Sequence, residues 1–178
     1  MREDMPDQTD IHEHMPYLQA MAYLSSVIIE LGCGHGNGST RALSCGLSAS
    51  EHKGKAMISV DIDPMRPQIR PALDYWYKVT GSSTSPNTLE NVRFILGQRP
   101  ADLIFIDTVH TKEMLAQELA LWSALEHLGT IWLFHDTWMF GQYNSMVEAI
   151  QEFCADGKHE YVELTKECHG MWLMRKRG

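Results

Sequence analysis

Ser26-Val-Ile-Ile-Glu-Leu-Gly-Cys-Gly-His-Gly-Asn-Gly-Ser-Thr40 is the stretch on which the interpretation of the whole chain depends. The β-branched residues at 27–29 are typical of a strand that is covered on both faces in a parallel sheet. Glycines at alternating positions follow, and they allow the backbone to turn sharply and to approach a ligand closely. Ser39 and Thr40 can cap a helix. The stretch therefore predicts a buried strand, a ligand-binding loop and a helix.

The glycine spacing matches neither of the two common nucleotide-binding loops. A dinucleotide-binding loop has glycines at its first, third and sixth positions, but counting from Gly32 the sixth residue is Asn37. A P-loop contains Gly-Lys-Ser/Thr, and no lysine lies near these glycines. The pattern acid-x-Gly-x-Gly-x-Gly, which begins at Glu30, instead resembles motif I of the class I S-adenosylmethionine (SAM) dependent methyltransferases. The alternative is an ordinary glycine-rich turn of an α/β domain.

Length and composition indicate one domain, which we expect to span residues 15–178. The 178 residues, 44% of them hydrophobic, suffice for one well-packed core but not for two domains of ordinary size. No apolar run approaches the ~20 residues of a membrane span, and residues 1–8 contain no hydrophobic core of the kind found in signal sequences. The cysteines form no CxxC pair, as is typical of reduced thiols. We expect a cytoplasmic protein without a membrane partner.

The net charge and the N-terminal residues indicate which partners the protein is expected to have. The net charge of −8 argues against nucleic acid, since binding phosphates requires a basic surface. Residues 1–14 are acidic and lack hydrophobic periodicity, which predicts a flexible arm or a partner-binding tail, with His12 and His14 in solvent. The helix expected over residues 15–24 has an apolar face that little of the chain remains to cover. We therefore expect a homo-oligomer, at least a dimer.

Apolar periodicity predicts the other elements. Helices are expected over residues 39–48, 71–79, 111–129 and 144–154, and strands over residues 57–61, 91–96, 101–107, 130–135, 161–165 and 170–174. The polar segment 81–87 has the composition most typical of disorder. The order of elements predicts an α/β fold, a three-layer α/β/α sandwich with a seven-stranded, mostly parallel sheet whose last strand is antiparallel. The motif I resemblance implies the Rossmann-like class I methyltransferase fold.

Asp61 ends the second predicted strand. Ligands of open parallel sheets bind beyond the carboxyl ends of the strands. Asp61 is therefore placed to accept hydrogen bonds from both ribose hydroxyls of SAM. The alternative is a turn-capping role, which either Asp61 or Asp63 could fill.

Two further predicted strands end in acids and histidines. Asp107 and His110 follow strand 101–107, and His135 and Asp136 follow strand 130–135. Adjacent parallel strands bring these four side chains to one rim of the sheet. A lone histidine after a strand is usually structural, but two histidines with two aspartates can bind a metal ion and transfer protons.

The same residues resemble the class I subgroup that includes the macrolide and rhamnosyl sugar O-methyltransferases and the cephalosporin hydroxylase proteins. The resemblance implies a divalent cation, commonly Mg²⁺, held by Asp107 and Asp136 with His135 as a third candidate ligand. It also implies catalytic roles for His110, as the base, and for Asp107. The family's usual Gly-Asp between the acid and the histidine is Thr108-Val109 here.

The motif I resemblance also implies a set of SAM-binding residues. They are Glu30, Gly32, Gly34, Gly36, Ser39 and Asp61, with Gly97 and Gln98 at the adenine. The resulting hypothesis is a SAM-dependent methyltransferase that methylates the hydroxyl of a small-molecule acceptor with help from a divalent cation. One alternative is a SAM- or nucleoside-binding module without turnover that acts through a partner. A nicotinamide oxidoreductase is a third reading, which the missing sixth glycine disfavours.

Overall fold

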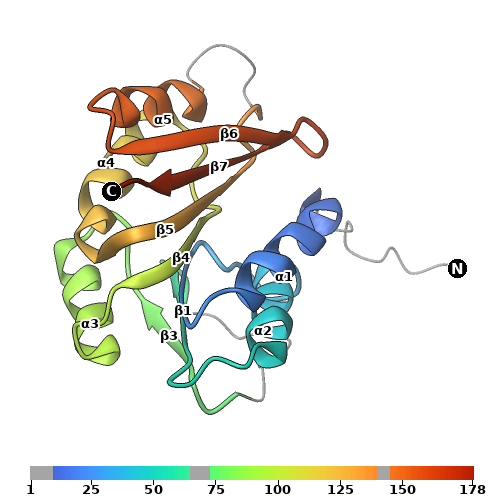
Figure 1. Cartoon of the computed structure of the whole chain (residues 1–178), viewed down its shortest axis with the longest axis vertical. Helices are drawn as coiled ribbons and strands as arrows, with labels where there is room; N and C mark the ends of the chain where they lie inside the picture. Colours follow the sequence, from blue (N-terminus) through green and yellow to red (C-terminus); the bar gives the residue numbers. More distant parts are fainter. Residues whose placement is uncertain (1–9, 65–72, 140–144) are drawn as a thin grey trace, which may run out of the picture.

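The computed structural model describes residues 10–64, 73–139 and 145–178. Its centre is a seven-stranded sheet in the order β3-β2-β1-β4-β5-β7-β6 (Figure 1). The pairs β3–β2, β2–β1, β1–β4 and β4–β5 are parallel, and β7 is antiparallel to both of its neighbours. The predicted seven-stranded, mostly parallel sheet with an antiparallel last strand is confirmed. The strands are β1 (Val27–Leu31), β2 (Ala56–Asp61), β3 (Trp76–Thr80), β4 (Ala101–Ile106), β5 (Glu126–His135), β6 (His159–Thr165) and β7 (Met171–Lys176).

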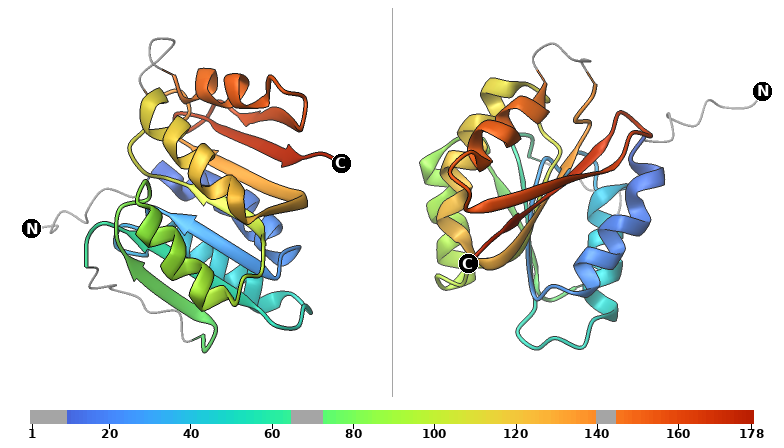
Figure 2. Two further views of the ribbon diagram at one scale, coloured as in Figure 1. Left: turned by 90° about the vertical axis from the view of Figure 1, so that its left-hand side faces the viewer. Right: turned by 45° about the horizontal axis from the view of Figure 1, so that its top comes forward.

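Helices cover both faces of the sheet, which gives the three predicted layers (Figure 2). Neighbouring residues of one strand point to opposite faces. Ile28 accordingly packs with the first helical layer and Ile29 with the second. The first layer holds η1 (Asp10–His14), α1 (Met15–Tyr23) and α2 (Ser39–Ala49); the second holds α3 (Pro86–Leu96), α4 (Lys112–Trp122), η2 (Ser123–Leu125) and α5 (Met146–Cys154).

The prediction of a helix over residues 71–79 is wrong. Trp76–Thr80 forms β3, which pairs with β2, while residues 71 and 72 lie outside the described residues. The run Trp-Tyr-Lys-Val-Thr consists mostly of aromatic and β-branched residues, which suit a half-buried strand. That preference outweighs the helix-starting prolines upstream on which the prediction rested.

The prediction of a strand over residues 91–96 is also wrong, because these residues belong to α3. Pro86 in the first turn and Gly97 after the last, with φ of 60°, are typical helix ends. Val92 is buried whereas Phe94 is 86% exposed, as on an amphipathic helix. The disorder expected over residues 81–87 is not observed, since this segment contains the buried Ser83 and the first turn of α3.

The helix expected over residues 111–129 ends earlier, at Trp122, and β5 begins at Glu126. α5 begins at Met146, and residue 144, the expected start, lies outside the described residues. Within the described residues, no helix has the length and apolar character needed to cross a membrane.

The N-terminal region differs from the predicted arm. Residues 1–9 lie outside the described residues, but Asp10–His14 forms η1, in which His14 is fully buried and His12 is exposed. Leu18 of α1 packs into the core against α2. The two helices can approach this closely because Gly46 has no side chain. A Cβ at this position would lie 2.2 Å from the Gln19 carbonyl oxygen. The chain itself thus covers the buried face of α1, and this helix no longer supports the predicted dimer.

Candidate functional site

A cavity of about 290 Å³ opens where four parallel strands end. Three of the predicted SAM-binding residues, Gly32, Gly34 and Asp61, line it together with Asp107. The other lining residues are Val60, Ile62, Gly81, Ser82, Ser83, Thr108, Val109 and Met114. The cavity therefore occupies the carboxyl edge of the sheet, where the sequence placed the ligand.

The glycines of the loop after β1 serve different purposes. Gly32 has φ of 82°, and a Cβ there would lie 1.8 Å from the backbone oxygen of Asp107. Only glycine therefore lets the end of β1 pass so close to the end of β4. Gly34 also has positive φ, 46°, but a Cβ would meet no atom within 4 Å.

Asp61 fixes the glycine loop as well as lining the cavity. Its Oδ2 accepts hydrogen bonds from the backbone N–H groups of Cys33 (3.0 Å) and Gly34 (2.9 Å). Its Oδ1 accepts one from the N–H of Asp63 (2.9 Å), whose own side chain is exposed. Asp61 rather than Asp63 thus faces the cavity.

Glu30 and Ser39 lie beneath the loop and bind each other. The carboxylate of Glu30 is fully buried and accepts hydrogen bonds from the hydroxyls of Ser39 (2.7 Å), Thr40 (2.9 and 3.0 Å) and Ser59 (2.5 Å). These bonds join β1, α2 and β2. Burial raises the pKa of Glu30 to about 7, although the three hydroxyls oppose the shift. Neither residue lines the cavity, so both would support a ligand through the loop.

Glu30→Gln is expected to remove a pH dependence from folding stability. Because the pKa is raised from 4.5 to about 7, folding favours the protonated carboxyl group. Its contribution to the free energy of unfolding is complete below pH 4.5 and is lost, by about 3 kcal/mol, as the pH rises to about 7. Urea unfolding at pH 5 and pH 8 measures the change. Parallel pH profiles for the variant, the wild type and the exposed control Glu51→Gln would contradict the assignment.

Gly97 and Gln98, predicted to contact adenine, lie away from the cavity. They follow α3, which ends near the opposite edge of the sheet: Arg99 hydrogen-bonds the carbonyl of Gly54, before β2 begins. The prediction assumed a strand ending at residue 96, and the real strand, β3, ends at Thr80. Gly81, Ser82 and Ser83 line the cavity instead. The strand-forming composition of residues 76–80 could have predicted that a strand ends at residue 80 and that the three residues after it lie at the cavity. Gly36 is buried in the loop and does not line the cavity.

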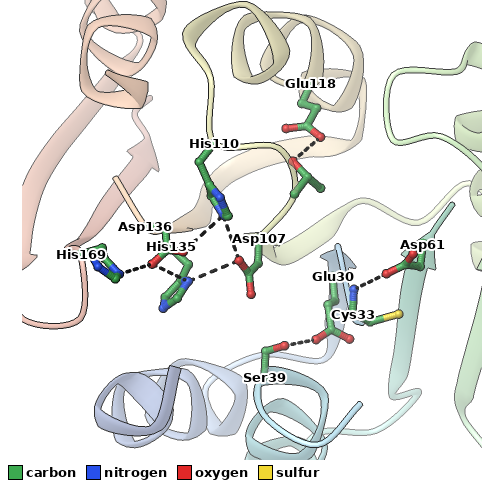
Figure 3. A network of polar contacts seen from close by, with 11 residues as sticks. Glu30, Cys33, Ser39, Asp61, Asp107, His110, Glu118, His135, Asp136 and His169 are labelled. Carbon is green, nitrogen blue, oxygen red and sulfur yellow. Dashed lines mark hydrogen bonds and ion pairs between the residues drawn. The ribbon is translucent and has the colours of Figure 1, made fainter. Parts of the chain in front are cut away.

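Asp107, His110, His135 and Asp136 form the predicted cluster, with one potential ligand atom from each lying within 4.8 Å of all the others (Figure 3). Asp107 Oδ1 lies 3.1 Å from His110 Nε2 and 3.3 Å from His135 Nδ1. Asp136 Oδ1 is 3.2 Å from His135 Nδ1, and Asp136 Oδ2 is 3.7 Å from His110 Nε2. Since Asp107 also lines the cavity, the cluster adjoins it.

Electrostatics and backbone conformation both mark this cluster. Burial opposes ionisation of Asp107, but hydrogen bonds and charge from His110 and His135 lower its pKa to about 2. Asp136 has φ of 55°, a conformation that is uncommon for non-glycine residues, although aspartate adopts it more readily than most, and that carries some strain. Its side chain is 6% exposed and points into the cluster.

Two further histidines, which the sequence analysis did not place at this site, lie beside the cluster. The ring of His14 meets the ring of His135 edge to face, with centroids 4.9 Å apart. The Nε2 of His14 lies 3.0 Å from the carbonyl oxygen of Glu167, between β6 and β7. His169, from the same connection, has Nδ1 3.6 Å from Asp136 Oδ1. No local pattern signals these contacts, since they join residues far apart in the chain.

Residues 29–137, more than half of the chain, match the family described as a methyltransferase domain. The chain belongs to this family. The matched segment holds the glycine loop, Asp61 and the whole Asp-His cluster. The resemblance to class I SAM-dependent methyltransferases is thereby confirmed. No protein in the curated set matches this methyltransferase.

Solved structures share the fold of this methyltransferase. A provisionally assigned O-methyltransferase from Klebsiella pneumoniae is 14% identical with a TM-score of 0.66, covering 100% of this chain and 84% of its own. A provisionally assigned caffeoyl-CoA O-methyltransferase from Staphylococcus aureus is 12% identical with a TM-score of 0.67, covering 93% and 83%. MycE, a methyltransferase of the mycinamycin biosynthetic pathway in complex with Mg and SAH, is 13% identical with a TM-score of 0.64, covering 97% and 55%. At these identities the likeness establishes the Rossmann-like methyltransferase fold.

Proposed function

We propose that this methyltransferase transfers the methyl group of SAM to the hydroxyl oxygen of a small-molecule acceptor with the help of a divalent cation. The observation that carries the proposal is that Asp107 belongs both to the cavity and to the Asp-His cluster. A methyl donor in the cavity and a proton-accepting group in the cluster would therefore meet. Holding donor and acceptor in line supplies ~7 to 11 kcal/mol of the barrier reduction in reactions of this kind.

The cavity wall supports a specific placement of SAM. Gly32 and Gly34 expose backbone to the methionine part, and Asp61 offers carboxylate oxygen to the ribose hydroxyls. The remaining wall, with Ser82 and Ser83, is left for the adenine. Glu30 and Ser39 act through the loop that they support.

The chemistry of the cluster fits a divalent cation. Asp107 and Asp136 offer the hard oxygen atoms that Mg²⁺ prefers, and the ring nitrogen of His135 is a donor better suited to Mn²⁺, Fe²⁺ or Zn²⁺. A bound cation lowers the pKa of an acceptor hydroxyl. The related MycE structure contains Mg, and we take Mg²⁺ as the first candidate.

His110 is the proposed base. Its ring is 15% exposed and is oriented by the hydrogen bond to Asp107. A histidine held in this way can accept the proton of the acceptor hydroxyl near neutral pH. Asp107 stabilises the imidazolium that results, because its low pKa keeps it ionised.

Binding and product analysis test the proposal. Calorimetry with SAM, S-adenosylhomocysteine (SAH) and NAD should show binding of the first two only. Incubation with methyl-labelled SAM and an extract of small metabolites should then yield label in methyl ethers, which are stable to alkali, and EDTA should prevent it. Label in N-methyl products would contradict O-methylation. Binding of SAM without transfer to any metabolite favours the alternative, a SAM- or nucleoside-binding module that acts through a partner.

Asp61→Ala is expected to weaken SAM binding by about 2 to 4 kcal/mol, because two hydrogen bonds to a charged acceptor are lost at roughly 1.5 to 3 kcal/mol each, less some replacement by water. This corresponds to a roughly 30- to 1000-fold increase in Kd. Asp63→Ala is the matched control, since its side chain is exposed two residues away. Calorimetry that finds normal SAM binding in Asp61→Ala and weak binding in Asp63→Ala would assign the ribose to Asp63.

A further inference from the structure

Glu118 is a buried acid on the core-facing side of α4. It is 0% exposed and shares that side of the helix with Leu115, Leu119 and Trp122. Burying a carboxyl group costs free energy that an apolar side chain of similar size avoids. Burial also raises the pKa of Glu118. Apolar packing within the core therefore does not explain an acid at this position.

Both residues whose hydroxyl groups bind Glu118 line the cavity. Ser83 donates from Oγ (2.5 Å) and Thr108 from Oγ1 (2.8 Å), and both bonds end on Glu118 Oε1. The other oxygen, Oε2, is buried and has no hydrogen-bond partner among the described residues. In Figure 3 Glu118 points from α4 toward the segment that follows β4. One carboxyl oxygen thus holds the segments that follow β3 and β4.

The direction of these two hydroxyl hydrogens decides what the wall can bind. A hydroxyl group has a single hydrogen and two lone pairs. Because Ser83 and Thr108 direct their hydrogens to Glu118, a ligand atom that meets either hydroxyl oxygen would find only lone pairs. Such a wall favours an N–H donor and repels a carbonyl oxygen.

We infer that Glu118 is a positioning residue that makes the cavity select a 6-aminopurine over a 6-oxopurine. The inference rests on the proposed function, in which the adenosyl group occupies the cavity. With the ribose on Asp61, the purine is the part of the ligand that reaches Ser83 and Thr108. Its exocyclic amino group supplies the donor that these oxygen atoms require. Glu118 acts through the two hydroxyls and does not itself line the cavity.

The test compares, by calorimetry, the affinities for SAH and S-inosylhomocysteine, in which a carbonyl replaces the amino group. The wild type is expected to bind SAH at least about tenfold more tightly, because a site built for an N–H donor rejects the analogue that lacks it. In Glu118→Gln the amide can donate to one hydroxyl and release that hydroxyl's hydrogen toward the cavity, so the ratio should fall to about threefold or less. Thr108→Val, which keeps the acid, should also lower the ratio.

Glu113→Gln is the matched control, since it makes the same chemical change at an exposed position of α4, and it should keep the wild-type ratio. A wild type that binds neither compound would refute the proposed function itself. A wild type that binds SAH without discrimination would overturn the inference alone. The inference would also be overturned if Glu118→Gln and Thr108→Val kept the wild-type ratio of affinities. A purely structural role predicts that both variants lose affinity for the two compounds equally, and that result would overturn it as well.

Discussion

Replacing His110 with alanine is expected to lower the rate of methyl transfer about 10²- to 10⁴-fold, the range that a general base contributes. His110 Nε2 lies 3.1 Å from Asp107 Oδ1, so the ring is oriented at the point where cavity and cluster meet. The measurement is the rate of SAH formation at saturating SAM and acceptor. His52→Ala, at an exposed position, is the control and should keep the wild-type rate.

Measuring metal affinity distinguishes the proposed base, His110, from the proposed metal ligands. His110→Ala should keep the wild-type affinity for Mg²⁺ or Mn²⁺ in calorimetry, whereas Asp136→Ala should lose it, because a carboxylate donor is removed. EDTA should abolish turnover and leave SAM binding unchanged, since Gly32, Gly34 and Asp61 lie outside the cluster. Turnover that survives EDTA would refute metal assistance and leave a metal-free transferase that relies on His110 or His135.

Gly32→Ala should have the largest effect on folding. The added Cβ would lie 1.8 Å from the Asp107 carbonyl oxygen and 2.6 Å from its carbon, both backbone atoms that cannot rotate away. The positive φ of 82° adds strain for any L side chain. We expect a loss of more than about 4 kcal/mol in the free energy of unfolding, a large part of the 5–15 kcal/mol that a domain usually has.

Gly34→Ala is the matched control for that experiment. Its φ is also positive, 46°, but a Cβ meets no atom within 4 Å, so the expected cost is only the roughly 1–2 kcal/mol of the left-handed conformation. Urea unfolding of both variants measures the difference. Equal destabilisation would show that backbone conformation alone, and not the approach of β1 to β4, requires Gly32.

The glycine loop and the strand-end acids could be predicted because their signals are local. A buried strand that contains the acid Glu30 leads directly into the glycines of residues 32–38, and Asp61, Asp107 and Asp136 each stand at the end of a run of strand-forming residues. Parallel strands place such positions at one edge. The structure brings Asp61 and Asp107 into one cavity, as expected. Gly97 and Gln98 were expected at this edge and lie elsewhere, because residues 71–96 carry mixed signals, with prolines before a strand and β-branched residues inside a helix.

What the sequence alone determined is therefore the fold class, the edge of the sheet at which the cavity opens and the four residues of the Asp-His cluster. Only the tertiary structure showed that Glu30 binds Ser39 beneath the loop, that Glu118 holds Ser83 and Thr108, and that His14 packs on His135. The physical reason is range. Periodicity and turn chemistry act between neighbours in the chain, whereas a buried polar group takes whichever partner folding brings to it, as His14 takes the carbonyl of Glu167, 153 residues away.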